Sequence, residues 1–149
     1  MSVCRGYRTR IYWPHTGDRL TVLLIEDDPD VRVFLVSHFG RIPGLVLDVA
    51  NSGSEGLGKC ITAAYDLILL DLHLPDGGGL DILPVLRSSL PQAVMAIISG
   101  YTDLVTEVDF AVADTVISKP FDLSSIDDLV CTTREILKCR ARIRSLGIT

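Results

Sequence analysis

Four short polar motifs, each directly after a run of apolar residues, constrain the fold of this chain more than any other feature. The motifs are IEDD at 25–28, LDLHLP at 70–75, ISG at 98–100 and SKPF at 118–121. The apolar runs before the first three motifs are typical of buried strands, and the run before the fourth is weaker. Parallel strands that alternate with helices end at one edge of their sheet, where ligands bind. We therefore expect three carboxylates, a hydroxyl and an ammonium to converge at that edge.

The rest of the chain alternates strand and helix patterns from Leu20 onward. Predicted strands cover Leu20–Ile25, Leu45–Val49, Asp66–Asp71, Ala93–Ile98 and Thr115–Ser118. Predicted helices begin at Pro29 after an Asp28 N-cap, at the Ser52–Glu55 capping box, near Leu80, within Thr102–Val112 and near Ser124. Pro84 should kink or shorten the third helix, which we expect to end near Ser88. This order predicts an α/β fold, a doubly wound five-stranded parallel sheet with five helices.

Composition narrows the function classes. A chain of 149 residues with 48% hydrophobic residues is long enough for one domain with its own core. No apolar run approaches the ~18 residues that a membrane span needs. The four cysteines have no metal-ligand spacing, and we expect them to be reduced thiols in a cytoplasmic protein.

Charge is distributed unevenly along the chain. The whole chain has a net charge of −5. Residues 1–19 carry +3 and residues 129–149 carry +4, so the segment between them carries −12. An acidic body with basic ends does not resemble a nucleic-acid module, which gathers cations on one face. The basic C-terminal segment is interpreted as a solvated helix end that suits the helix dipole, with a docking patch as the alternative.

The four motifs, in this order and at this spacing, resemble the receiver domain of two-component response regulators, of the chemotaxis-regulator-like type. The resemblance covers about Leu20 to Arg140. It implies a flavodoxin-like fold with strand order 2-1-3-4-5, and transfer of a phosphoryl group from a histidine kinase or a histidine phosphotransfer protein to one aspartate. We expect a poorly ordered N-terminal arm at 1–19, a receiver domain at 20–146 and no output domain.

The resemblance also assigns roles to single residues. Asp71 is the expected phosphoacceptor, and Glu26 and Asp27 are the acidic pair, with Asp27 a direct metal ligand and Glu26 acting largely through water. The backbone carbonyl of His73 is the expected third ligand. Ser99 is expected to hydrogen-bond the phosphoryl group and Lys119 to pair with it. The Lys119–Pro120 bond that follows is expected to be cis. Val116 stands where the family often has an aromatic switch residue.

Chemistry supports these residue types independently of the resemblance. Mg²⁺ or Mn²⁺ is the expected cofactor, because hard cations bind carboxylates, carbonyls and water. Crowded carboxylates repel one another unless a cation lies between them. A carboxylate can form an acyl phosphate, and phosphoryl transfer needs positioning and charge neutralisation. The His73 side chain is expected to face solvent beside the site, because such cations prefer oxygen.

Each motif alone has a plainer explanation, since an acidic pair after a strand is usually a helix N-cap; Asp28 is left out of the site for this reason. The leading hypothesis is a signalling phosphoacceptor, not an enzyme, that assists its own phosphotransfer and dephosphorylation and contacts an unknown downstream protein, with no direct nucleic-acid or membrane partner. A homodimer through helix four, strand five and helix five is a further expectation. Alternatives are a receiver excised from a larger regulator or hybrid kinase, and an Asp-nucleophile phosphatase. The latter needs a second Asp where His73 stands.

Overall fold

A computed structural model describes residues 19–74, 79–100 and 112–147 of the chain. The elements follow the predicted order, with boundaries that differ from the predictions by a few residues at most. They are β1 (Leu20–Ile25), α1 (Pro29–Phe39), β2 (Leu45–Ala50), α2 (Gly53–Thr62), β3 (Leu67–Asp71), α3 (Gly79–Ser89), β4 (Val94–Ser99), β5 (Thr115–Ser118) and α5 (Leu123–Ser145).

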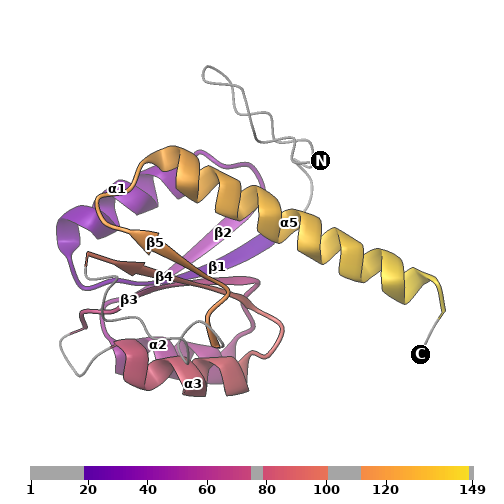
Figure 1. Cartoon of the computed structure of the whole chain (residues 1–149), viewed down its shortest axis with the longest axis horizontal. Coiled ribbons are helices and arrows are strands. Elements are labelled where there is room, and N and C mark those ends of the chain that lie inside the picture. The colour runs from indigo at the N-terminus through magenta and orange to yellow at the C-terminus, as the bar shows by residue number, and fades with distance from the viewer. Residues whose placement is uncertain (1–18, 75–78, 101–111, 148–149) are drawn as a thin grey trace.

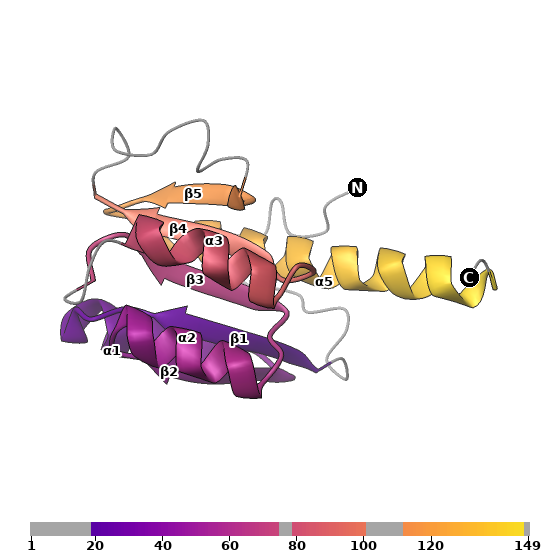
Figure 2. The ribbon, with the colours of Figure 1, turned by 90° about the horizontal axis from the view of Figure 1, so that it is seen from below.

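The five strands form one parallel sheet in the order β2-β1-β3-β4-β5, which confirms the predicted topology. Helices α1 and α5 cover one face of the sheet, and α2 and α3 cover the other (Figure 1). The view from below shows α2 and α3 lying side by side across the strands (Figure 2), in agreement with the contacts between these two helices. The fold is therefore the doubly wound α/β architecture that the alternating patterns predict.

Two apolar clusters, one on each face, hold these layers together. On the face of α1 and α5, Leu35 and Phe39 of α1 pack with Ile126 and Val130 of α5 and with strand residues. On the other face, Leu83 and Leu86 of α3 pack against the sheet. The strands β1, β3 and β4 contribute to both clusters, which explains why their sequences are almost uniformly apolar.

Side-chain caps set the helix starts as predicted. The Asp28 carboxylate accepts a hydrogen bond from the Asp30 amide (2.9 Å), and Pro29 occupies the first turn of α1. The Ser52 hydroxyl accepts one from the Glu55 amide (3.2 Å) at the start of α2. These caps satisfy amides that have no partner within the helix, and they fix where the chain leaves the strand ends.

Helix α3 contains Pro84 and ends at Ser89, one residue beyond the predicted end near Ser88. Other expectations need correction or lie outside the described residues. Cys131 takes part in a disulfide whereas Cys60 and Cys139 are free, so the prediction of reduced thiols fails for Cys131. The described residues contain four helices instead of five, because the helix expected within Thr102–Val112 falls almost wholly outside them, as does the arm expected at 1–19.

None of the helices in the described ranges is both long enough and apolar enough to cross a membrane.

Candidate functional site

The strand register brings the predicted polar residues to one edge of the sheet. Ile25 of β1 lies opposite Leu70 of β3, so Glu26 and Asp27 follow one strand where Asp71 ends its neighbour. Asp71 lies opposite Ile98 of β4, next to Ser99, the last residue of that strand. The ends of three separate segments therefore meet at this edge, as the strand-end argument predicts.

Lys119, directly after β5, joins the two sides of this edge. Its ammonium lies 3.1 Å from Glu26 Oε2 and 3.4 Å from Asp71 Oδ2. Its backbone amide donates to the Ser99 carbonyl at 2.8 Å, and the Lys119–Pro120 peptide bond is cis. The lysine thus contacts β1 and β3 through its side chain and β4 through its backbone.

The carboxylates of Glu26, Asp27 and Asp71 form a compact acidic cluster. One oxygen from each lies within 4.8 Å of the other two. Glu26 and Asp71 are buried, whereas Asp27 is not. Oxygen ligands at this spacing, with one side open to water, suit a hard divalent cation that keeps part of its hydration shell. The donor set therefore fits Mg²⁺.

Burial and mutual repulsion make this cluster electrostatically unfavourable without a cation. Burial, a hydrogen bond with Asp71 and the Asp71 charge raise the pKa of Glu26 to about 7, against a smaller opposing effect of the Asp28 amide and Lys119. Burial lowers the pKa of Lys119, but the two carboxylates outweigh it and raise that pKa above its ordinary value. A divalent cation would favour the ionised form of Glu26.

The backbone after β3 supports Asp71. The His73 amide donates to Asp71 Oδ1 at 3.1 Å, and the His73 residue is exposed beside the cleft, as expected. Its backbone carbonyl stays a predicted ligand. At the start of α3, the Gly79 amide donates to the Leu72 carbonyl at 2.7 Å. A Cβ on Gly79 would lie 2.3 Å from the Asp71 carbonyl oxygen, so only glycine permits this approach.

A cleft of about 310 Å³ opens over the cluster and is lined by Asp27, Asp28, Asp71, His73, Gly100 and Lys119. Asp28 therefore has two places in the structure, as the N-cap of α1 and in the cleft wall, whereas the sequence argument gives it only the first. Val116, at the position of the family's switch residue, is partly buried against the core.

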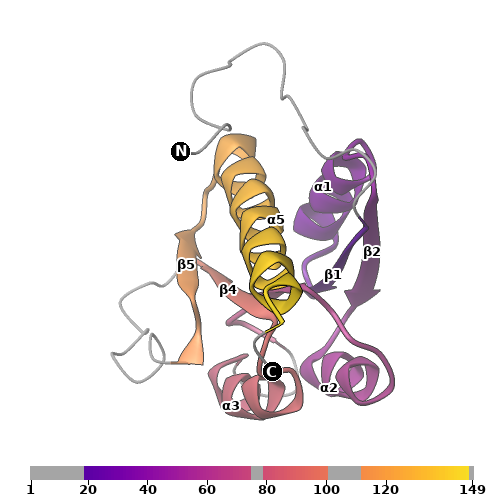
Figure 3. The same cartoon turned by 90° about the vertical axis from the view of Figure 1, so that its right-hand side faces the viewer.

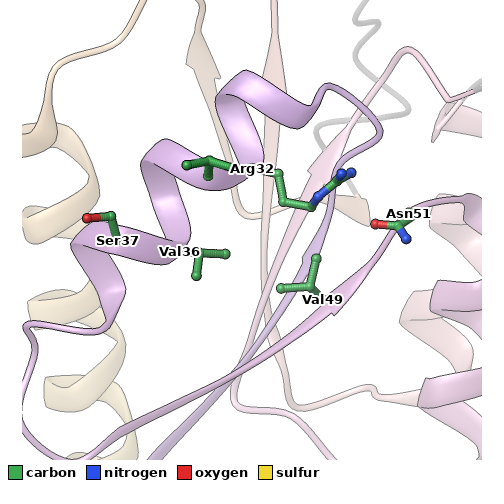
Figure 4. A pocket seen from close by; sticks show the side chains of 6 residues that line it. Arg32, Val36, Ser37, Val49 and Asn51 are labelled. Atoms are coloured by element: carbon green, nitrogen blue, oxygen red, sulfur yellow. The ribbon is translucent and has the colours of Figure 1, made fainter.

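Arg32 of α1 is a supporting residue that the sequence argument missed. Its guanidinium donates to the backbone carbonyls of Glu26 (3.2 Å) and Asp27 (3.4 Å), and so holds the end of β1 from behind. It also lines a second hollow of about 540 Å³ between α1 and β2, with Val33, Val36, Ser37, Val49 and Asn51 (Figure 4). This hollow is mostly aliphatic and carries no carboxylate, so it is not a second metal site.

A third hollow, of about 520 Å³, lies on the α1 side of Lys119 and is lined by Asp30, Val31, Phe34, Lys119, Pro120 and Phe121. The rings of Phe34 and Phe121 lie 6.3 Å apart, at an angle of 51°. Apolar surface therefore reaches Lys119 from outside the acidic cleft.

Comparison with known proteins places this geometry in a family. The response regulator receiver domain matches residues 22–130. The response regulator protein PilR of Pseudomonas aeruginosa is 34% identical over 116 residues, which are 76% of this chain and 26% of PilR. The chain spans between about a quarter and about half of the length of the curated relatives it matches.

Solved structures of similar proteins share the fold. Response regulator TrrA of Thermotoga maritima, in complex with Mg²⁺-BeF, has a TM-score of 0.70 at 24% identity and covers 76% of this chain and 98% of its own. TrrA in complex with histidine kinase ThkA has a TM-score of 0.68 at 24% identity, and the match covers 76% of this chain and 97% of that one. A response regulator from Burkholderia pseudomallei, with a phosphorylated aspartic acid and a calcium ion, has a TM-score of 0.67 at 25% identity. The match covers 82% of this chain and 73% of that one. On the family match, the chain belongs to the response regulator receiver domain family.

Proposed function

We propose that the chain accepts a phosphoryl group on Asp71 in a reaction that depends on a divalent cation. The observation that carries the proposal is the cluster itself, in which Asp71 lies beside Glu26, Asp27 and the Lys119 ammonium. The phosphorylated aspartic acid of the Burkholderia protein and the Mg²⁺-BeF complex of TrrA support it by similarity.

In the proposed transfer, a carboxylate oxygen of Asp71 forms a bond to phosphorus while the bond from phosphorus to the donor imidazole breaks. The imidazole nitrogen keeps the electron pair. Asp27, Asp71 and the His73 carbonyl would hold Mg²⁺ or Mn²⁺, with Glu26 acting through water, and the cation when bound neutralises phosphoryl oxygens. Lys119 exchanges its carboxylate contacts for a phosphoryl oxygen, and the Ser99 hydroxyl donates to another.

The proposed donor is a histidine kinase or a histidine phosphotransfer protein. TrrA has been crystallised with such a kinase, which supports this class of partner. The apolar hollow formed by Val31, Phe34 and Phe121 beside Lys119 offers the donor a surface next to the acceptor. The proposal also includes a receiver domain that spans residues 20–146. This domain would contact a downstream protein target and form a dimer through helix four, strand five and helix five.

A phosphatase that turns over Asp71 is not favoured. Such an enzyme needs a second Asp two residues after the nucleophile as its general acid, and His73 stands there, with its amide bonded to Asp71. The proposed role is therefore a signalling phosphoacceptor that assists its own phosphorylation and dephosphorylation.

Intact-mass measurement after incubation with acetyl phosphate tests the acceptor. We expect a gain of about 80 Da, one phosphoryl group, that requires Mg²⁺ or Mn²⁺ and disappears in Asp71→Asn. Asp28→Asn is the matched control, because Asn also caps a helix and the residue lies in the same cleft; it should keep the adduct. An adduct that persists in Asp71→Asn, or its absence from the native chain with either cation, would refute the assignment.

A further inference from the structure

The three carboxylates of the acidic cluster are held to different extents. The Glu26 carboxylate accepts hydrogen bonds from the Asp28 amide and the Lys119 ammonium, each at 3.1 Å. Asp71 also contacts Lys119, at 3.4 Å. The Asp27 carboxylate, in contrast, makes no hydrogen bond or ion pair in the part of the chain that the structure describes, and Asp27 is not buried. Its direction therefore depends on the backbone that carries it.

Arg32 fixes that backbone on both sides of Asp27. Its Nη1 atom donates to the carbonyl of Glu26 at 3.2 Å and to that of Asp27 at 3.4 Å. The first carbonyl belongs to the planar peptide group before the Asp27 Cα atom, and the second belongs to the peptide group after it. A change in φ or ψ of Asp27 moves one of these groups relative to the other. Such a change would therefore break at least one of the two bonds.

Arg32 reaches this loop from outside the cleft. Helix α1, which carries it, lies beside β1 and β2 (Figure 3). The Arg32 side chain lines the hollow between α1 and β2, with Val36, Val49 and Asn51 (Figure 4), and it is not among the described residues that line the cleft over the cluster. This hollow, of about 540 Å³, opens to solvent. A substitution of Arg32 therefore leaves the wall of the cleft unchanged.

We propose that Arg32 is a positioning residue that sets the affinity of the acidic cluster for its divalent cation. By holding both peptide groups of Asp27, it directs the Asp27 carboxylate toward those of Glu26 and Asp71. This role rests on the proposed function, in which the cation binds at the cluster. Side chains that orient a metal ligand contribute about 10–100-fold to metal affinity, and the contribution of Arg32 is expected in this range.

The charge of Arg32 and its hydrogen bonds act on the cation in opposite directions. A guanidinium beside the cluster repels a divalent cation, so the charge alone weakens binding. The two hydrogen bonds hold a ligand in place and so strengthen binding. Arg32→Met keeps an unbranched side chain but removes both the charge and the donors. The sign of its effect therefore separates the two contributions.

Mg²⁺ alone is the probe, because a cation that binds only the folded chain raises its stability against urea. The rise of the urea midpoint with Mg²⁺ concentration gives the dissociation constant without any phosphoryl transfer. We expect this constant to increase by about tenfold or more in Arg32→Met. Arg41→Met is the matched control and should leave the constant unchanged. Arg41 is exposed beyond the end of α1, and its side chain makes no hydrogen bond or ion pair with the described residues.

A guanidinium supplied from solution tests the geometry. Arg32→Ala should lose cation affinity as Arg32→Met does. Methylguanidinium should restore part of it through the open hollow, because this ion carries the same forked donors. Methylammonium, which has the same charge without the fork, should restore less. If neither variant folds in a chelator, Arg32→Lys takes their place; it keeps the charge, and its lack of a fork should still weaken Mg²⁺ binding, by a smaller factor.

An unchanged or tighter Mg²⁺ affinity in the Arg32 variants would overturn the proposal, because the charge would then dominate. An equal loss in Arg41→Met would also overturn it, as would equal restoration by methylammonium or a wild-type midpoint that does not respond to Mg²⁺. Phosphoryl uptake from acetyl phosphate in Arg32→Met should require more Mg²⁺ and reach the wild-type rate at saturation. Absence of uptake from every chain would count against Asp71 as the acceptor and leave the Mg²⁺ comparison intact.

Discussion

The buried carboxyl of Glu26 makes a quantitative prediction about stability and pH. Glu26 is fully buried, and its pKa is raised from an ordinary 4.5 to about 7, first by burial and then by Asp71. Between these values the folded chain keeps a proton that the unfolded chain has lost. Without a divalent cation, the free energy of unfolding should therefore fall as the pH rises from about 4.5 to 7, and then level off.

The size of the effect follows from the two pKa values. A difference from 4.5 to about 7, at 1.36 kcal/mol per pH unit, corresponds to about 3 kcal/mol. Glu26→Gln removes the titrating group and should remove this part of the slope. Lys119, whose pKa is also raised, affects stability only in alkaline solution, as pH rises toward and past 10.5, outside this window.

Urea denaturation from pH 5 to pH 8, with a chelator present, measures the free energy of unfolding of the wild type and of Glu26→Gln. The comparison uses slopes, so that histidines and other groups titrating in both chains cancel. Glu135→Gln, an exposed change of the same kind, should keep the wild-type slope. Saturating Mg²⁺ should restore wild-type stability at pH 8, because the cation favours the ionised cluster. Equal slopes for wild type and Glu26→Gln would refute the reasoning, since Glu26 would then not be the group that titrates.

Three further predictions concern close packing and buried contacts, one at the site and two elsewhere in the fold. Gly79→Ala should cost about 1–3 kcal/mol and reduce phosphoryl uptake, because its Cβ would meet the Asp71 carbonyl, whereas Gly58→Ala, with open space around it, should gain about 0.5–1 kcal/mol; urea denaturation and mass measurement separate the two. Arg87→Ala should cost about 2–3 kcal/mol in urea, because its guanidinium bonds the Val112, Pro91 and Ala93 carbonyls and Asp114; Arg87→Lys should recover little, and full recovery would contradict the forked geometry. Phe39→Ala should cost about 3–5 kcal/mol while the folded fraction still takes up phosphoryl; loss of uptake at full folding would contradict its purely structural place.

Strand ends could be predicted from the sequence because they depend on local pattern. The uniformly apolar run before Glu26 gives β1 its observed limits, and the run before Asp71 gives β3 its end. Once those ends are known, parallel pairing brings the ends of β3, β4 and β5 to one edge, although Asp71 and Lys119 are far apart in the chain. The central part of the site therefore follows from sequence periodicity.

The supporting residues could not be found in this way. Gly79 matters because α3 begins against the carbonyl of Asp71, and Arg32 because its side chain reaches back from α1 to the end of β1. Both are distances in space that no spacing in the sequence encodes. Helix α3 tolerates Pro84 in its interior, because Leu83 and Leu86 on its buried side stabilise the helix against the cost of one lost hydrogen bond.

The unequal burial of the strands implies that backbone amides on the two sides of the site exchange with solvent at different rates. Every residue of β1, β3 and β4 is buried or nearly so, whereas β5 is a short edge strand with no fully buried residue. Backbone amides of the first group should exchange with solvent only when the whole domain opens, and those of β5 through local fraying. The acidic cluster lies at the ends of the slowly exchanging strands β1 and β3, and Lys119 follows the rapidly exchanging strand β5. If Asp71 gains the proposed charge, β5 is therefore the strand whose position costs least to change.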